Sequence, residues 1–375
     1  MNNNDNSQRD DLLKEIEQRS SLIEKKRVIE TVKIEKQFAE IKETEKEKER
    51  LKTVDVTAID EGFLQKMDWE QKMMRESVSR RMTFVTPNLT DFVPFTYPNL
   101  ILIGAKTGQG KSTFASNMIY QLMVNHRKSL LLSNEEKSVD VYNRLSCLHK
   151  GWNYNDRNYF SEEQWEEMTR LRHVMYRSGR VRVIDSDYES FKDATTSFEG
   201  VKFILDNLYN TFLEKKKLDE SASPDFDCIV LDYYQKVSSS IENPQLKQWE
   251  VLKKLSDYLD NFYKKYPAPV VIFCQLKSEA GDDDYFETRI KEGKAILVPA
   301  TFAMELKPDK KTRVTEFIPH KHRWSNRIDE KIKLVWERGL FVDHTPEHDV
   351  MIATENNSYA ESKMLESVRK GQGSA

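Results

Sequence analysis

The sequence lacks a large excess of either charge. Its 375 residues include 62 acidic residues against 59 lysines and arginines, which leaves a formal net charge of −3. Bulk charge therefore indicates no nucleic-acid partner, and any such site must be a local patch or a channel. No apolar run approaches the ~18 residues that cross a bilayer, and the N-terminal Met-Asn-Asn-Asn-Asp-Asn-Ser lacks the layout of a secretory signal. We expect a cytoplasmic protein without membrane contact.

Cysteine is also scarce. Cys147, Cys228 and Cys274 form no Cys-x-x-Cys pair and no cluster with histidine, and two of them lie inside apolar runs typical of strands. This pattern excludes a disulfide framework and a cysteine-based zinc site. We expect three buried thiols in a reducing compartment.

Glycine and proline are absent from Gln8 to about Lys52, where Glu, Lys, Arg and Gln predominate. That composition favours one long charged helix. Its apolar residues drift in spacing and support no sustained heptad register. Two interpretations stay open: a solvated or partly disordered arm, and an arm that docks its apolar stripe on a neighbouring subunit. We place the arm at 1–58, a linker helix and loop at 59–98, the main domain at 99–344 and a flexible tail at 345–375.

Within the main domain, apolar runs typical of strands alternate with amphipathic helical stretches. The predicted strands are 100–103, 129–132, 181–184, 228–231 and 270–274, with 315–318, 331–335 and 340–342 extending the sheet. The predicted helices are 113–125, 139–150, 161–176, 198–217 and 245–263. This alternation predicts an α/β fold, with a mostly parallel sheet covered by helices on both faces.

The first predicted strand runs directly into a phosphate-binding motif, Gly-Ala-Lys-Thr-Gly-Gln-Gly-Lys-Ser-Thr. Strand, glycine-containing loop and helix are the context that a P-loop requires. Lys111 is expected to reach the β- and γ-phosphates of ATP, and Ser112 to offer its hydroxyl to Mg²⁺. One departure is visible, because Ala105 occupies the usual first glycine position and Gly104 stands one place earlier. The expected cradle comprises Ala105, Thr107, Gly108, Gln109, Gly110, Lys111, Ser112 and Thr113.

Two acidic residues supply what a phosphate cradle lacks. Asp232 ends the apolar strand Asp-Cys-Ile-Val-Leu-Asp and is expected to hold Mg²⁺, while Glu135 ends another strand and is expected to activate the attacking water. The ends of parallel strands converge on one crevice, so the distance between these residues in the sequence is no objection.

Several segments resemble DnaB-type replicative helicases, whose ATPase domain is RecA-like. The run Asp-Cys-Ile-Val-Leu-Asp-Tyr-Tyr-Gln is similar to the second nucleotide motif of that family, and Ser-Asn-Glu-Glu, followed by Arg144, to its catalytic-glutamate segment. Pro-Val-Val-Ile-Phe-Cys-Gln resembles its sensor strand and ends at Gln275. Lys321-His-Arg323 resembles the pair that reaches into a neighbouring subunit's ATP. The resemblance covers about residues 86–344.

The resemblance implies roles for two further groups of residues. Gln275 would sense the γ-phosphate, and Lys321 and Arg323 would act in trans, with Arg327 as a spare candidate; a basic loop without a trans role is the alternative. The run 277–294 would grip the DNA backbone in a central channel. Its acidic 282–284 segment leaves a plain surface loop open. The expected DNA contacts are Lys277, Arg289, Lys291 and Lys294.

Because a charged helix and linker stand where the family carries a globular N-terminal domain, we expect a phage or mobile-element version that lacks this domain. The function expected from the resemblance is that of a ring hexamer that uses ATP and Mg²⁺, translocates 5′ to 3′ on single-stranded DNA and unwinds duplex at the replication fork. A primase or helicase loader is a possible further partner. Two rivals remain: a RecA- or RadA-like recombination ATPase that forms filaments, and a non-motor assembly or adaptor protein that only binds nucleotide.

Overall fold

The computed structural model describes residues 82–349, except 187–193, 278–284, 310–311, 324, 326–327, 329 and 338, together with single positions between 65 and 75. The chain divides into two compact units, Met1–Met67 and Asp68–Ala375. The predicted arm 1–58, most of the linker helix, Arg327 and the tail beyond residue 349 lie outside the described residues. The fold described below belongs to the second unit.

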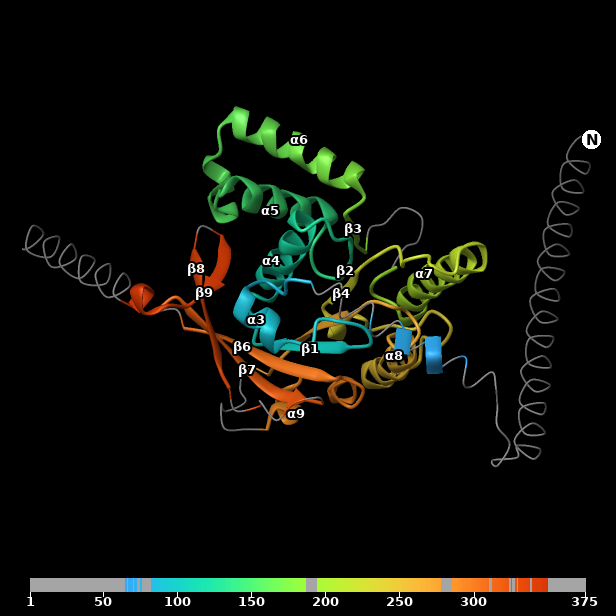
Figure 1. Ribbon diagram of the computed structural model, residues 1–375. Helices are drawn as coiled ribbons and strands as arrows, with labels where there is room; N and C mark the ends of the chain where they lie inside the picture. The colour runs from blue at the N-terminus through green and yellow to red at the C-terminus, as the bar shows by residue number, and fades with distance from the viewer. Residues whose placement is uncertain are drawn as a thin grey trace, which may run out of the picture. The chain divides into compact units, whose positions relative to one another are not determined.

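A nine-stranded sheet runs through this unit in the order β3-β2-β4-β5-β1-β6-β7-β8-β9 (Figure 1). Every neighbouring pair from β3 to β6 is parallel, and β6 to β9 continue the sheet as antiparallel neighbours. The predicted α/β class with a mostly parallel sheet is confirmed. The strands are β1 Leu100–Ala105, β2 Ser129–Ser133, β3 Val181–Ile184, β4 Cys228–Asp232, β5 Val270–Gln275, β6 Phe302–Pro308, β7 Val314–His322, β8 Ile332–Glu337 and β9 Leu340–Asp343.

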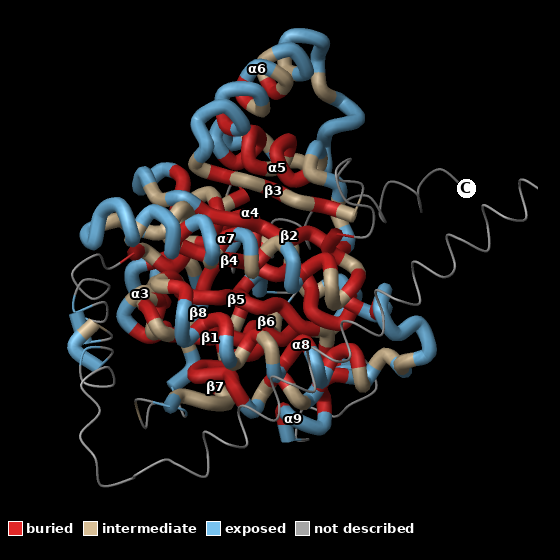
Figure 2. The backbone as a smooth tube through the Cα atoms, turned by 90° about the vertical axis from the view of Figure 1, so that its right-hand side faces the viewer, coloured by how far each residue is buried: buried red, intermediate tan, exposed pale blue. Residues whose placement is uncertain are grey.

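Helices cover both faces of the sheet, and each face has its own apolar cluster (Figures 1 and 2). On one face lie α3 Pro87–Phe92, α4 Lys111–Val124, α5 Ser138–Lys150 and α6 Glu162–Ser178. On the other face lie α7 Phe198–Leu218 and α8 Gln248–Phe262. The short elements are η1 Tyr154–Tyr159, η2 Tyr234–Lys236, α9 Phe286–Arg289 and η3 Lys294–Leu297.

The central strand β1 shows why this sequence makes a rigid support. All of its residues are buried, and β5 and β6 flank it on either side. Ile101 and Ile103 pack into the first apolar cluster, while Leu100 and Leu102 pack into the second. Each such side chain contributes about 1.5–3 kcal/mol on full burial, so β1 holds whatever follows its C-terminal end in a fixed position.

The sequence does not predict β6, although this strand joins the parallel and antiparallel parts of the sheet. It reads Phe-Ala-Met-Glu-Leu-Lys-Pro, in which Glu305 interrupts the apolar pattern. Glu305 is nevertheless buried, because Arg289 of α9 is its ion-pair partner. A charged residue in a buried strand is recognisable only once that partner is known.

The expectation of three buried thiols is confirmed, because Cys147, Cys228 and Cys274 are all buried and free. Within the described ranges, no helix has both the length and the apolarity needed to cross a membrane.

Candidate nucleotide-binding site

The predicted P-loop joins β1 to α4. Gly108 and Gly110 have φ angles of +72° and +84°, in the left-handed region that favours glycine. The loop closes on itself, because the Lys106 amide donates to Oε1 of Gln109 at 2.9 Å and the Gln109 amide donates to the Lys106 carbonyl at 3.2 Å. Among the described residues, no side chain caps the N-terminus of α4. Its first amides therefore remain available to an anion, as phosphate binding at a helix N-terminus requires.

The shifted glycine of the motif has a packing cause. A Cβ at Gly104 would meet the ring of Phe286 at 2.9 Å and Cδ2 of Leu276 at 3.0 Å. Gly104 therefore leaves room for the segment that follows β5 and makes no turn of the phosphate loop. Ala105 is the last residue of β1 and pairs with Gln275, and its carbonyl accepts a hydrogen bond from the Leu276 amide at 3.0 Å.

Asp232 lies at the C-terminal end of β4 and is buried beside the P-loop. The Ser112 hydroxyl hydrogen-bonds the Asp232 carboxylate. The Oδ1 atom of Asp232 has no hydrogen-bond partner among the described residues. Burial raises the pKa of Asp232 to about 6, against the hydrogen bond from Ser112 and the charge of Lys111, which lower it. An orphaned carboxylate oxygen next to a hydroxyl suits a hard cation.

The residues present therefore fit a Mg²⁺ ion that arrives with its nucleotide. Among the described residues, no group of three or more His, Cys, Asp or Glu side chains could hold a metal by itself. Mg²⁺ commonly takes one or two protein oxygens and completes its coordination with phosphate and water. Ser112 and Asp232 would supply the protein oxygens.

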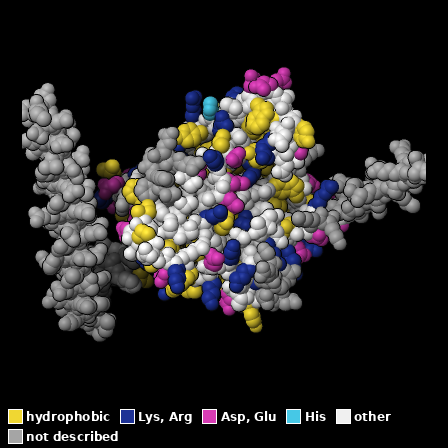
Figure 3. All heavy atoms as spheres, turned by 180° about the vertical axis from the view of Figure 1, so that it is seen from behind, with side chains coloured by type: hydrophobic (Ala, Val, Ile, Leu, Met, Phe, Trp, Pro, Cys, Tyr) yellow, Lys and Arg dark blue, Asp and Glu magenta, His cyan; other side chains and the backbone are white. Residues whose placement is uncertain are grey.

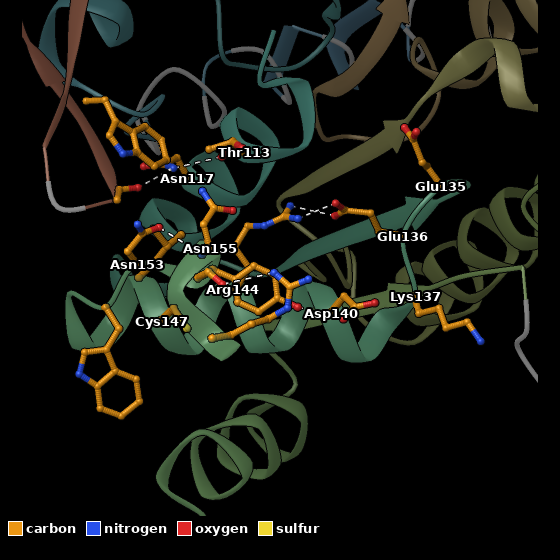
Figure 4. A pocket seen from close by; sticks show the side chains of 16 residues that line it. Thr113, Asn117, Glu135, Glu136, Lys137, Asp140, Arg144, Cys147, Asn153 and Asn155 are labelled. Carbon is orange, nitrogen blue, oxygen red and sulfur yellow. Dashed lines mark hydrogen bonds and ion pairs between the residues drawn. The ribbon is translucent and has the colours of Figure 1, made fainter. Parts of the chain in front are cut away.

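Glu135 and Glu136 follow β2 and differ sharply in their surroundings. Glu136 forms a bidentate ion pair with Arg144 of α5, at 2.8 Å from Nη1 and 2.5 Å from Nη2. The exposed Glu135 side chain points away from that pair (Figure 4), and no described residue is its hydrogen-bond partner. Its charge is close enough to raise the pKa of Asp232. Of the two carboxylates, Glu135 is therefore the one without a hydrogen-bond partner among the described residues.

A pocket of about 410 Å³ opens beside Thr113 and Glu135 (Figure 4). Its walls come from α4, α5, η1 and the hairpin of β8 and β9, and they include Tyr154 and Trp336. Asn117 ties the hairpin to α4, because its amide donates to the Gly339 carbonyl and accepts from the Phe341 amide, both at 3.1 Å. The pocket falls within the size range of small-molecule sites.

Gln275, the expected sensor of the γ-phosphate, lies next to the P-loop. Gln275 ends β5, and its Nε2 donates to the Thr107 hydroxyl at 2.5 Å. The phosphate loop therefore contacts Gln275 directly, and a movement of the loop could be passed to the segment that follows β5.

Lys321 and Arg323 lie near the N-terminal end of β1, whereas the P-loop follows its C-terminal end. The Arg323 amide donates to the Thr301 carbonyl at 2.9 Å, and the Thr301 amide donates to the Leu100 carbonyl at 2.8 Å. Leu100 starts β1, whereas the P-loop follows its other end. Six strand residues span roughly 16–20 Å, so these basic residues lie far from the P-loop of their own chain.

Lys321 and Arg323 differ in their local contacts. The Lys321 ammonium donates to the carbonyls of Leu297 and Val298 at 2.6 and 3.0 Å. Burial, and then the charge of Arg323, lower the pKa of Lys321. Arg323 is exposed; its side chain makes a 3.4 Å contact with the Val298 carbonyl and also hydrogen-bonds the Tyr263 hydroxyl.

Comparison with known proteins decides the family. The family model described as "DnaB-like helicase C terminal domain" matches residues 90–285, more than half of the chain. This chain belongs to the DnaB-like helicase family. Its fold is similar to a separately solved ATPase domain, with a TM-score of 0.55 and 17% identity, covering 78% of this chain and 100% of the other. A solved structure of a "DnaB-Like Replicative Helicase" with its primase interactions has a TM-score of 0.54 and 17% sequence identity. The match covers 78% of this chain and 68% of the other. No curated protein sequence matches.

The DNA-contact residues expected of this DnaB-like domain do not all lie at the surface. Lys277, Lys291 and Lys294 are exposed. Arg289 is not, because its side chain is buried and paired with Glu305. The expectation that Arg289 contacts DNA therefore needs correction, since its guanidinium already has a carboxylate partner inside the protein.

Surface charge on the described residues follows the sequence expectation. Basic and acidic side chains intermingle over the face seen in Figure 3 and form no single basic stripe there. A DNA site on that face would therefore have to be local.

Proposed function

We propose that this DnaB-like protein is an ATP-dependent replicative DNA helicase, a ring of six subunits that hydrolyses Mg-ATP at its seams. Single-stranded DNA passes through the ring, and duplex is unwound in the 5′ to 3′ direction. Membership of the DnaB-like helicase family supports the activity. One geometric observation supports the assembly: the P-loop and the Lys321–Arg323 pair lie at opposite ends of β1.

This separation favours a site shared between subunits. Lys321 and Arg323 cannot reach their own P-loop without dismantling the central sheet. A head-to-tail arrangement would place them against the P-loop of the next copy, and head-to-tail contacts close into rings when the rotation permits. An arginine acting in trans stabilises the charge of the transferring phosphoryl group and makes neighbouring subunits depend on each other.

The chain's own residues divide the chemistry among them. Lys111 and the amides at the start of α4 would bind the phosphates, and Ser112 and Asp232 would hold Mg²⁺, which neutralises charge on the phosphates when bound. Glu135 would orient the attacking water and accept its proton. The pocket beside Thr113 is large enough to take the nucleoside end of the ligand.

The exposed lysines at positions 277, 291 and 294 would contact the DNA backbone. Such contacts carry no base information, so they can be released and remade during translocation. A primase is a further partner that we propose from the similar helicase whose structure was solved with its primase interactions.

Turnover of ATP with and without single-stranded DNA tests the proposal. Glu135→Gln should lower turnover by about 10²- to 10⁴-fold, because the variant cannot accept the proton of the attacking water. Glu163→Gln, a change of an exposed carboxylate on α6, is the matched control and should behave as wild type. A forked DNA should be separated by wild type and by the control, and not by Glu135→Gln.

Particle images with an ATP analogue and single-stranded DNA provide the assembly test. Six subunits around a DNA-filled pore are expected. A lone subunit under these conditions, or equally slow turnover by wild type and Glu135→Gln with no stimulation by DNA, would overturn the proposal.

A further inference from the structure

Gln235 occupies a buried position between the parts of the site that bind nucleotide and the segment that follows β5. It lies in η2, three residues after Asp232 in the sequence. Its side chain is only slightly exposed. A buried primary amide must satisfy two donors and an acceptor, so its partners are fixed by the fold.

The partners of this amide are backbone groups of two separate segments. Oε1 of Gln235 accepts from the Gln275 amide at 2.9 Å, and Nε2 donates to the Gln275 carbonyl at 3.1 Å. Nε2 also donates to the Lys291 carbonyl at 2.9 Å. The Gln235 side chain thus hydrogen-bonds both the backbone amide and the backbone carbonyl of Gln275, and it links them to the Lys291 carbonyl.

The turn that carries Gln235 is itself anchored. Gln248 of α8 donates to the Gln235 carbonyl at 2.8 Å, and the buried Tyr234 hydroxyl donates to the Leu252 carbonyl. Gly293 packs so closely that a Cβ there would meet Cε1 of Tyr234 at 2.5 Å. The amide of Gln235 is therefore presented from a rigid base.

Backbone hydrogen bonds join the start and the end of the 277–291 segment, next to the residues that Gln235 contacts. The Lys277 amide donates to the Arg289 carbonyl at 2.7 Å, and the Lys291 amide donates to the Gln275 carbonyl at 3.0 Å. A displacement of Gln275 must therefore move both the start and the end of the 277–291 segment. The Gln275 side chain contacts Thr107 of the P-loop, which makes the phosphate loop the natural source of such a displacement.

We propose that Gln235 is a positioning residue that couples the Thr107–Gln275 contact to the lysines at 277, 291 and 294, so that nucleotide state and DNA affinity depend on each other. The proposal rests on the function proposed above. Coupling of this kind is reciprocal: nucleotide changes DNA affinity and DNA changes nucleotide affinity by the same factor, commonly about 5- to 150-fold.

The full chain with Gln235→Leu provides the test, because leucine keeps the volume and removes all three hydrogen bonds. The dissociation constant of a fluorescent single-stranded oligonucleotide is measured with an ATP analogue and with ADP. The ratio of the two constants should fall toward one in the variant, and the KM for ATP should lose its dependence on DNA. Folding is checked by thermal unfolding. Gln235→Glu, which keeps the shape and cannot donate to the Gln275 and Lys291 carbonyls, should lose the coupling in the same way.

Gln248→Leu is the matched control. It removes one hydrogen bond from the same turn, which the Tyr234 hydroxyl and the packing of Gly293 still anchor, and it touches neither Gln275 nor Lys291. Its two dissociation constants should therefore keep the wild-type ratio. Wild-type coupling that persists in both Gln235 variants overturns the inference, as does an equal loss of coupling in Gln248→Leu. A wild-type protein whose turnover ignores DNA would instead overturn the proposed function itself.

Discussion

Replacement of Arg289 by methionine should destabilise the protein strongly. Arg289 of α9 pairs with Glu305 of β6, and the two side chains are only 2% and 3% exposed. His320 of β7 approaches the other oxygen of Glu305 at 3.3 Å, and its ring stacks on Phe286 at 4.3 Å. The buried Arg289–Glu305 pair, with the partly buried His320 beside it, holds α9 against β6 and β7.

The size of the effect follows from the burial of Glu305. Burial alone would raise the pKa of Glu305, yet the hydrogen bonds from His320 and Arg289 hold it below its ordinary value. Without Arg289 the carboxylate remains buried with only His320 beside it. Loss of one partner of a buried ion pair costs about 3–5 kcal/mol, which corresponds to a fall of roughly 6–20 °C in Tm for a domain of this size. Arg289→Met combined with Glu305→Met should be milder, because no charge is left buried without its partner.

Urea unfolding, followed by tryptophan fluorescence, measures the free energy of unfolding. Lys217→Met is the matched control, because Lys217 pairs with Glu214 on α7 and both side chains are 70% exposed; its midpoint should not change. A loss below about 1 kcal/mol in Arg289→Met would refute the reasoning. So would a double variant whose loss equals the sum of the two single losses, since the buried charges would then be independent.

Two further outcomes are expected. Because burial raises the pKa of Asp232 from 3.8 to about 6, the metal-free protein should lose stability as pH rises from the lower value through the higher one. Asp232→Asn should remove this loss. In thermal unfolding with chelator, the variant should be more stable than wild type by about 3 kcal/mol at pH 7, and the difference should vanish below the ordinary aspartate pKa. An equal difference in stability at low and neutral pH would contradict this expectation. The shared site can be tested by mixing equal amounts of two inactive variants, Lys111→Ala and Lys321→Ala/Arg323→Ala. Random assembly should leave about one seam in four with an intact P-loop and an intact basic pair, so ATP turnover should partly recover. No recovery in mixed rings would contradict a site shared between subunits.

Local sequence patterns were sufficient for most of the parallel sheet. Most of the first five predicted strands are nearly continuous apolar runs, such as Leu-Ile-Leu-Ile in β1, and strands buried on both faces carry that pattern. The exception is β3, Val-Arg-Val-Ile, which alternates between buried and partly buried residues. β6 escaped prediction because the charge of Glu305 breaks the run. Its stability depends on Arg289, which belongs to another element and gives no local signal.

The same reason limits what the sequence reveals of the site. The P-loop and Asp232 are recognisable because glycine spacing and a strand-end carboxylate are local features. Arg289 looks like a DNA contact in the sequence, since a basic residue in a polar loop is ordinarily exposed; its partner is visible only in three dimensions. Gln235 lies inside a recognisable motif, but its partners are backbone groups of distant segments, and no residue pattern identifies backbone partners.

The close contact between Gly104 and Phe286 constrains how this protein can change over time. A methyl group at position 104 would collide with the aromatic ring, and β1 has no freedom to withdraw because strands flank it on both sides. Alanine at 104 would require the side chains of Phe286 and Leu276 to shift or to be replaced by smaller ones. Substitutions at 104 and 286 are therefore expected to depend on each other.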